Sequence, residues 1–304
     1  MLYGRIKINL PEHTENYGLN KTQKDKIIAK WGNDFYLKIL REIEIYSEKW
    51  KLSEFNYIEY VSFNAIFSCK SELYGDCVLK IYSEYSEYNT LREYNGGRFI
   101  KVFECENDVM LMERVIPGTM LKNEPSLEKR LAVYLELFKR LHIESKNPEI
   151  YDSYTKWVCD RVEYMNTREN CEELYAYMLK AKEIYLEMLT VYNKNLLLHG
   201  DFHYANILLN SNGEYKLIDP LGYVGDPIFE FGRNMIIEYY KAENQFETII
   251  KMVKYYEKSL TIPNKIFKQC FYIDMVANKC CRVEGGDTAD LVDAKFAESI
   301  LNTK

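Results

Sequence analysis

The sequence predicts an α+β protein with two lobes, a β-rich N-terminal lobe and a mostly helical C-terminal lobe. Short runs rich in β-branched and aromatic residues fill residues 57–116, and turn signals separate several of them. After Pro117-Gly118 the apolar residues recur mostly at helical spacing. A chain of 304 residues is long enough for two modest domains. We therefore expect lobes at residues 1–116 and 117–304, joined near residues 113–118.

The N-terminal lobe is expected to open with a helical extension over residues 20–52. Apolar side chains recur there at helical spacing with charges between them: Ile27, Ile28, Trp31, Phe35, Ile39, Ile43 and Tyr46. Strands are then predicted at residues 57–63, 64–70, 77–82, 98–105 and 109–116. One helix, residues 84–94, interrupts this β region.

The C-terminal lobe is predicted to be helical except near its centre. Helices are expected at about 126–145, 151–166, 170–193, 227–242, 243–260 and 264–281. The exception is LLLHGDFHYANILLNSNGEYKLIDPLG, residues 196–222, which predicts two short strands around a polar turn. A polar motif at residues 199–206 therefore stands immediately before an apolar strand.

The composition is that of a globular protein without a nucleic-acid or membrane partner. Hydrophobic residues make up 47% and charged residues 28%, and the net charge of −6 does not favour binding to a phosphate backbone. No run approaches the roughly 18 apolar residues of a membrane helix, and the first residues do not resemble an export signal. We expect a cytoplasmic protein that is a monomer or a weak dimer.

The eight cysteines are expected to be buried or surface thiols. They form no CxxC pair and have no histidines at metal-ligand spacing, so a zinc site or disulfides are the less favoured alternatives. The cysteines are Cys69, Cys77, Cys105, Cys159, Cys171, Cys270, Cys280 and Cys281.

The polar motif HGDFHYAN carries the strongest chemical signal. His199, Asp201 and Asn206 match the H-x-D-x-x-x-x-N spacing of the catalytic loop of kinases. In that loop the aspartate accepts the proton of the acceptor hydroxyl and the asparagine binds magnesium. Further on, LIDP places Asp219 at the end of an apolar strand, where it can supply a second oxygen ligand to Mg²⁺. The turn at residues 210–213 lets the two strands fold back and bring Asn206 and Asp219 together.

The predicted N-terminal sheet supplies a basic partner for phosphates. Lys80 lies among apolar neighbours in CVLKIY, where a charge requires a reason. Pairing with nucleotide phosphates and with a helix carboxylate provides one. Glu87 is the expected carboxylate, because Glu87, Leu91 and Tyr94 share a helix face, and Glu84 and Glu93 are the alternatives.

The segment MLMERVIPG is expected to form the hinge that binds the adenine edge. Main-chain groups of Glu113 and Val115 would bond the base, with Met112 behind it. No GxxxxGK[ST] motif occurs, so a P-loop nucleotide site is excluded.

Each of these residues also has a structural explanation. An aspartate after a glycine often serves only a turn, and Lys80 can extend its charge to solvent from a surface strand. His142 is expected to pack in the core, and His203 to cap the loop or contact phosphate. The order of the motifs, within a β-then-α chain, favours a phosphoryl-transfer enzyme over these separate explanations.

The run HGDFHYANIL…LIDPLGYVGDPIFEFGRNM resembles the antibiotic phosphotransferases of the protein-kinase-like fold. It is most similar to the aminoglycoside/hydroxyurea phosphotransferase family, the streptomycin 6-kinase-like group. SEKWKLSEF, EYNTLREYNGGRFIKVFE and LMERVIPGTML resemble segments of that group in the same order, so the resemblance covers most of residues 40–240.

The resemblance implies a bilobal protein-kinase-like fold and specific roles for the motif residues. Asp201 corresponds to the catalytic base, and Lys80 with Glu87 to the ion pair that binds phosphate. Asn206 and Asp219 correspond to the magnesium ligands. GDPIFEFG stands where the family has GDPxxDLA, which implies that Asp226 braces the loop, with a role in substrate binding as the alternative. Glu230 in place of Asp is a departure from the family pattern.

Two further departures bear on the nucleotide and on regulation. The expected phosphate-covering hairpin, SFNAIFS, contains Ser62 and Asn64 but lacks a glycine-rich pattern, which leaves GTP as an alternative to ATP. Pro220 follows Asp219 in place of Phe-Gly and stiffens the loop. A constitutively active small-molecule kinase is therefore favoured over a regulated protein kinase.

The expected reaction is ATP- and Mg²⁺-dependent phosphorylation of a hydroxyl on a small molecule, with an aminoglycoside such as streptomycin as the leading acceptor. Candidates for acceptor contacts are Asp226, Glu230 and His203, together with the acidic residues Glu238, Asp274 and Glu284. A metabolite kinase acting on a sugar or amino alcohol is the first alternative. A nucleotide-binding pseudokinase is the second, although base, metal ligands and lysine are all present.

Overall fold

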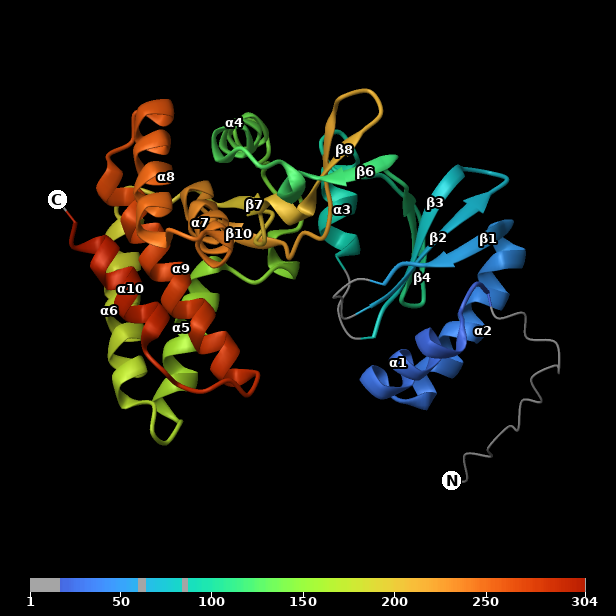
Figure 1. The fold of residues 1–304 in the computed structure, drawn as a ribbon, viewed down its shortest axis with the longest axis horizontal. Coiled ribbons are helices and arrows are strands. Elements are labelled where there is room, and N and C mark those ends of the chain that lie inside the picture. Colours follow the sequence, from blue (N-terminus) through green and yellow to red (C-terminus); the bar gives the residue numbers. More distant parts are fainter. Residues whose placement is uncertain (1–16, 60–63, 84–86, 304) are drawn as a thin grey trace. The chain divides into compact units, whose positions relative to one another are not determined.

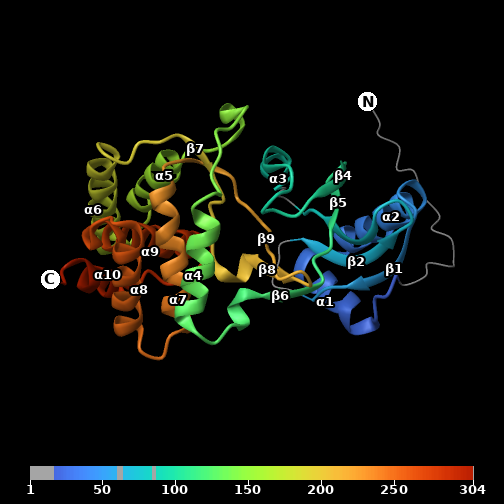
Figure 2. The same ribbon diagram turned by 90° about the horizontal axis from the view of Figure 1, so that it is seen from above.

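The computed structural model describes residues 17–59, 64–83 and 87–303 (Figure 1). The chain divides into two compact units, Met1–Val115 and Ile116–Lys304. Among the described residues, the N-terminal unit contains a sheet and the helices α1 to α3, and the C-terminal unit is mostly helical. Figure 2 shows the same ribbon from a second direction. The fold class predicted from the sequence is confirmed.

The N-terminal unit is a five-stranded antiparallel sheet of order β1-β2-β3-β5-β4. Its strands are β1 (Leu52–Tyr57), β2 (Ala65–Ser71), β3 (Gly75–Ile81), β4 (Val102–Glu106) and β5 (Val109–Glu113). Its helices are α1 (Lys21–Trp31), α2 (Asn33–Lys49) and α3 (Tyr88–Tyr94). Asn20 caps α1 by accepting the Gln23 N–H at 2.9 Å, while the Gln23 side chain bonds back to the Asn20 N–H.

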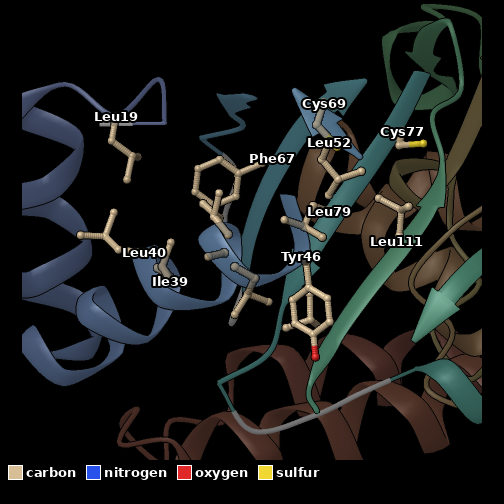
Figure 3. Packing of buried hydrophobic residues seen from close by; sticks show 14 of the residues in the cluster. Leu19, Ile39, Leu40, Tyr46, Leu52, Phe67, Cys69, Cys77, Leu79 and Leu111 are labelled. Carbon is tan, nitrogen blue, oxygen red and sulfur yellow. The ribbon is translucent and has the colours of Figure 1, made fainter. Parts of the chain in front are cut away.

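The core of this unit forms where α2 packs on one face of the sheet (Figure 3). Ile39, Ile43 and Tyr46 recur at helical spacing on α2 and are almost fully buried. They join the inward-facing strand residues Phe67 and Leu79, which are also fully buried. The helical periodicity predicted for residues 20–52 therefore marks the face that α2 buries.

The first strand begins earlier than predicted, because the chain leaves α2 at Lys49. Lys51 has φ of +53°, and its carbonyl accepts the Glu72 N–H at 3.1 Å, which starts the pairing of β1 with β2. The run predicted as strand 57–63 is therefore mostly not β1, and residues 60–63 lie outside the described residues. The inserted helix is α3, which begins at Tyr88 rather than at residue 84, and residues 84–86 are likewise outside the described part.

The C-terminal unit contains two small sheets and a set of packed helices. One sheet has the order β6-β8-β9 and the other pairs β10 with β7. The strands are β6 (Pro117–Met120), β7 (Leu196–Leu198), β8 (Ile207–Asn210), β9 (Tyr215–Leu217) and β10 (Tyr223–Gly225). The helices are α4 (Leu127–Phe138), α5 (Tyr154–Asn166), α6 (Glu172–Leu189), α7 (Glu230–Lys241), α8 (Gln245–Leu260), α9 (Asn264–Glu284) and α10 (Val292–Leu301).

The helix predicted at 126–145 is shorter than expected. It ends at Phe138, where the last turn tightens through bonds from Arg140 N–H to Leu137 O and from Leu141 N–H to Phe138 O, both 3.3 Å. Ile143 then forms a β-bridge with Leu197, so this part of the chain is extended. The helical spacing of apolar residues continues beyond Phe138, although the chain at Ile143 already pairs with a strand.

Helix α9 is the central element of the helical unit and packs against α6, α7 and α10. Where α7 crosses it, Gly232 allows the two helices to approach closely. A Cβ on Gly232 would lie 2.6 Å from both the Cβ of Asp274 and the carbonyl oxygen of Cys270. None of the helices formed by the described residues is long and apolar enough to span a membrane.

We expect Gly232→Ala to lower the free energy of unfolding by about 1–3 kcal/mol, because overpacking at a backbone contact outweighs the better helix propensity of alanine. Urea unfolding would measure the change. Gly285→Ala at the end of α9 is the matched control, because its nearest neighbours lie at 3.4 and 3.6 Å and its φ is −75°. Equal stability of the two variants would contradict the close packing of α7 on α9.

Candidate active site

The polar motif at residues 199–206 lies between β7 and β8 of the C-terminal unit. Gly200 has φ of +79°, and a Cβ there would lie 2.7 Å from the ring of Tyr223 on β10. Only glycine fits this position without strain, since it needs both a left-handed backbone and the space beside an aromatic ring. The following residue, Asp201, therefore emerges from a turn that the local backbone determines.

His199 anchors the turn from within the core. Its side chain is fully buried, and its Nε2 lies 3.0 Å from the carbonyl oxygen of Ile218. Its Nδ1 accepts the N–H of Asp201 at 3.3 Å, so the proton of the neutral ring is on Nε2. Burial lowers the pKa of His199, which keeps the ring neutral. The histidine therefore links the Asp201 backbone to the end of β9.

The Asp201 carboxylate is oriented by two side chains of its own loop. Its Oδ2 lies 3.2 Å from His203 Nε2 and accepts a hydrogen bond from Asn206 Nδ2 at 3.1 Å. His203 Nδ1 accepts the Ala205 N–H at 3.2 Å, so Nε2 carries the proton that points at Asp201. The Asp201 side chain remains 30% exposed, which leaves it accessible to a substrate.

Asp201 is ionised in this environment. Burial opposes its ionisation, but the hydrogen bond from His203 and the positive charge of Arg233 outweigh burial and hold the pKa of Asp201 well below its usual range. Because the carboxylate is ionised at neutral pH, it is able to accept a proton from a nearby hydroxyl group.

Asn206 and Asp219 are brought together as predicted, through the main chain. The Ile218 N–H donates to the Asn206 carbonyl oxygen at 3.1 Å, which places Asn206 beside the residue that precedes Asp219. The Asn206 amide nitrogen is used by Asp201, so the amide oxygen is the atom available to a ligand. Asp219 has φ of +54°, a left-handed conformation that aspartate tolerates better than most residues.

These two residues fit a magnesium ion chemically. An amide oxygen and a carboxylate are hard oxygen donors, and Mg²⁺ is usually bound by one or two such groups together with phosphates and waters. Because its amide nitrogen bonds to Asp201, Asn206 can offer only its amide oxygen to such an ion.

Glu230 and Asp226 both bind main-chain N–H groups, and Glu230 holds the loop from the start of α7. Glu230 is buried, and its Oε1 accepts the N–H of Gly200 at 3.1 Å. Asp226 is also buried, and its two carboxylate oxygens accept the N–H groups of Ile228 and Lys194, each at 3.0 Å. Both carboxylates therefore bond to the main chain, which is the geometry of bracing residues. The longer side chain of Glu230 reaches the loop from this position despite the departure from Asp.

The N-terminal unit contains a buried ion pair at the predicted residues. Lys80 Nζ lies 2.6 Å from Glu87 Oε1, and the two side chains are 4% and 2% exposed. Lys80 lies in the middle of the sheet, opposite Ile66 on β2 and Met110 on β5. A buried lysine requires a partner of opposite charge, and Glu87 supplies it at the start of α3.

The other nucleotide candidates lie on or beside the same sheet. Asn64 is buried and accepts the Ser83 N–H at 3.3 Å, whereas Ser62 lies outside the described residues. Met112 is buried on β5. The N–H of Glu113 donates to the Lys101 carbonyl at 2.9 Å.

The site also contains an ion pair, Arg233 with Asp274, that the sequence analysis did not predict. Arg233 on α7 has its Nε 3.5 Å from Asp201 Oδ1 and its Nη2 3.6 Å from Asp274 Oδ1 on α9. Asp274 was considered only as a contact for a cationic acceptor, and Arg233 was not considered. The only signal available in the sequence was the position of Arg233 three residues after Glu230, almost one helical turn away.

The other acidic residues considered for a cationic acceptor are paired with arginines. Glu238 binds Arg130 through two hydrogen bonds of 2.7 Å, and Glu284 forms an ion pair with Arg161. A carboxylate that already neutralises an arginine offers little net charge to a second cation. All eight cysteines are free thiols, and no group of three or more potential metal-binding His, Cys, Asp or Glu side chains occurs in the part of the chain that the structure describes.

Solved structures share this fold at low sequence identity. Aminoglycoside phosphotransferase APH(4)-Ia is 13% identical with a TM-score of 0.60, and the match covers 87% of this chain and 97% of that one. Choline kinase LicA from Streptococcus pneumoniae is 13% identical with a TM-score of 0.60, covering 88% and 99%. A choline kinase from Cryptosporidium parvum is 14% identical with a TM-score of 0.56, covering 88% and 93%.

The fold and the loop chemistry define a small-molecule phosphotransferase with the protein-kinase-like architecture. The sequence profile of the aminoglycoside/hydroxyurea antibiotic resistance kinases matches residues 76–276, which is about two thirds of the chain. The protein belongs to this family, and the resemblance noted in its sequence is confirmed. It is a phosphotransferase that uses an alcohol group as acceptor. A search of curated proteins found no match.

Asp274 is expected to make stability depend on pH. Burial raises the pKa of Asp274 from 3.8 to about 6, with Asp201 and Glu230 adding to the rise and Arg233 opposing it. Between these values the folded state holds the proton and the unfolded state does not, so stability falls as the pH rises from about 4 to about 6. The effect is at most about 3 kcal/mol and is complete by neutral pH.

Urea unfolding of the wild type and of Asp274→Asn across this pH range measures the effect. The wild type should lose stability relative to the variant as the pH rises, with a constant difference above about pH 7. Asp152→Asn, which removes a carboxylate that is 61% exposed, is the control and should follow the wild type. A difference that stays constant from acid to neutral pH would show that Asp274 has an ordinary pKa.

Proposed function

We propose that this protein transfers the γ-phosphoryl group of ATP, with Mg²⁺, to a hydroxyl group of an aminoglycoside such as streptomycin. The orientation of the Asp201 carboxylate is the observation that carries the proposal. Its Oδ2 is held by His203 and Asn206, so the carboxylate has a defined direction while part of it stays accessible. The reaction would take place in the cytoplasm, where ATP is supplied.

Asp201 acts as the general base in this proposal. The acceptor hydroxyl loses its proton to the carboxylate, its oxygen forms the new bond to phosphorus, and the bond from phosphorus to the leaving ADP oxygen breaks. His203 and Asn206 hold the carboxylate in line with the acceptor, and correct placement of reacting groups supplies much of the rate enhancement in such reactions. His203 acts here as an orienting group rather than as a substrate ligand.

Asn206 and Asp219 would hold the metal ion. Magnesium, when bound, would neutralise charge on the nucleotide phosphates. Asn206 directly precedes β8 and Asp219 comes shortly after β9, so the pairing of these two strands sets the distance between the proposed ligands.

Lys80 with Glu87 would bind the nucleotide phosphates, and the carbonyl of Glu113, the N–H of Val115 and the side chain of Met112 would receive the base. Ser62 and Asn64 belong to the segment proposed to cover the phosphates. Solved relatives of the same fold hold ADP, AMP-PNP or AMP. GTP is the alternative donor that the assay below includes.

The acceptor is proposed from the family and from one structural relative. The family name refers to resistance to aminoglycosides and hydroxyurea, and an APH(4)-Ia complex contains hygromycin B. The choline kinases among the structural relatives favour the second candidate, a metabolite kinase that acts on an amino alcohol or a sugar. Asp226 and Glu230 act as braces in both cases.

The proposal predicts that Asp201→Asn lowers kcat by about a hundredfold to ten-thousandfold, because the base is lost while the loop keeps its shape. Chelation of Mg²⁺ should abolish the remaining activity. A coupled assay of ADP release measures both, across aminoglycosides, hydroxyurea, choline and sugars, with ATP and with GTP.

Asp152→Asn is the control for loss of a carboxylate and should keep full activity, since it removes only an exposed surface charge. Turnover of streptomycin that disappears in Asp201→Asn supports the aminoglycoside kinase, and turnover of choline supports the metabolite kinase. Full activity in Asp201→Asn would refute the assigned base. Nucleotide binding without turnover of any acceptor would favour the pseudokinase.

A second prediction concerns the buried ion pair. Lys80→Met should weaken ATP binding and also lower the free energy of unfolding by about 3–5 kcal/mol, because Glu87 is left buried without its charged partner. In Lys80→Met/Glu87→Gln the stability should recover while the ATP affinity does not.

Lys70→Met is the matched control, because Lys70 lies on the neighbouring strand and pairs with Glu54 in a largely exposed position. It should change neither property by more than about 0.5 kcal/mol. Calorimetry of ATP binding and urea unfolding give the two readouts. Recovery of ATP affinity in the double variant would contradict a direct role of Lys80 at the phosphates.

A further inference from the structure

Arg233 connects the catalytic loop to the central helix of the C-terminal unit. On one side its Nε lies 3.5 Å from Oδ1 of Asp201. On the other side its Nη2 lies 3.6 Å from Oδ1 of Asp274, and its Nη1 donates to Oδ1 of Asn278 at 3.1 Å. One guanidinium therefore faces three oxygen atoms, two of them on α9 and one on the proposed base.

The surroundings of this arginine are largely closed to water. The side chains of Arg233 and Asp274 are 18% and 3% exposed. A cavity of about 10 Å³ adjoins them and is lined by aromatic side chains that include Tyr154, Trp157 and Tyr223. Electrostatic interactions are stronger in such a place than in water, and a cation there must be compensated by nearby negative charge.

The geometry requires a guanidinium rather than any cation. Arginine has five N–H donors in a planar fork, so its two terminal nitrogens can be held by α9 while Nε faces Asp201. A lysine at this position would carry the charge on one atom and could not satisfy both directions at once. Gly232 permits the close approach of α7 and α9 on which this arrangement depends.

The two oxygens of Asp201 have different neighbours. Oδ2 is held by His203 and Asn206, which belong to the loop itself. Oδ1 faces Arg233, which belongs to α7 and is fixed from α9. The loop hydrogen bonds therefore hold one oxygen of the carboxylate, and the charge of Arg233 lies within ion-pair distance of the other.

We infer that Arg233 is a positioning residue for Asp201, and that Asp274 and Asn278 hold Arg233 in place for this task. The 3.5 Å separation is slightly longer than a good hydrogen bond. Catalytic contacts are often long in the absence of substrate and tighten when the acceptor binds. The inference rests on the proposed role of Asp201 as base, and the first experiment is independent of that role.

The first experiment detects the contact itself by ¹⁵N–¹H spectra of the arginine Nε–H groups in the full chain. The Arg233 signal is identified by its absence in Arg233→Lys. It should shift in Asp201→Asn and in Asp274→Asn, because each variant removes a carboxylate that faces the guanidinium. The Arg161 signal is the internal control, since Arg161 pairs with Glu284 near the end of α9. An Arg233 signal that does not move in Asp201→Asn overturns the inference.

The second experiment measures kcat and KM separately with Mg²⁺-ATP and the acceptor that the wild type phosphorylates. Arg233→Gln should lower kcat by about 10- to 100-fold through misplacement of the base, with the KM for ATP unchanged within about twofold. Arg233→Lys should recover part of the loss, because it restores the charge without the fork.

Arg161→Gln is the matched control, because Arg161 is also 18% exposed and also pairs with a carboxylate of α9. It should keep kcat within about twofold of the wild type. Equal losses in Arg233→Gln and Arg161→Gln, or a loss confined to KM, would overturn the positioning role. If the wild type phosphorylates no acceptor, the proposed function fails, and the spectra still decide whether Arg233 contacts Asp201. They also decide it if Arg233→Gln does not fold.

Discussion

The buried carboxylate of Glu230 is the contact on which the geometry of the site depends. It accepts the N–H of Gly200 and so ties the start of α7 to the turn that presents Asp201. Gly200 has a left-handed backbone and lies against Tyr223, which leaves the turn little freedom. Because α7 also carries Arg233, the helix that holds the loop also bears on the orientation of the carboxylate. The position of α7 on α9 therefore matters directly for the chemistry.

A second set of contacts joins the loop at residues 199–206 to residues 218–222. His199 bonds to the Ile218 carbonyl, and the Ile218 N–H bonds to the Asn206 carbonyl. The N–H groups of Leu221 and Gly222 then return to the carbonyl of His199 at 2.7 and 3.1 Å. These main-chain bonds hold the proposed base and both proposed metal ligands in one short network. The positions of these side chains thus depend on main-chain hydrogen bonds, which form once the strands are paired.

The sequence analysis placed residues most accurately where their contacts depend on local spacing. The spacing of His199, Asp201 and Asn206 selected the loop, and the strand–turn–strand pattern after it predicted that Asn206 and Asp219 would meet. Glu87 was separated from its competitors by helix periodicity, and its carboxylate indeed lies beside Lys80. Boundaries were less accurate, since β1 and the end of α4 depend on pairing with Ser71 and Leu197 from other parts of the chain.

By itself the sequence determined the β-then-α order of the two lobes, the family, and the residue types of the polar loop at 199–206, because these follow from periodicity and from spacing within a few residues. Only the tertiary structure decided which charges are neutralised. Asp274, Glu238 and Glu284 looked alike as acidic residues, but each faces a different arginine brought by another helix. Ionisation and orientation depend on burial and on partners distant in sequence. Arg233 acquires its place beside Asp201 only when α7 and α9 pack together.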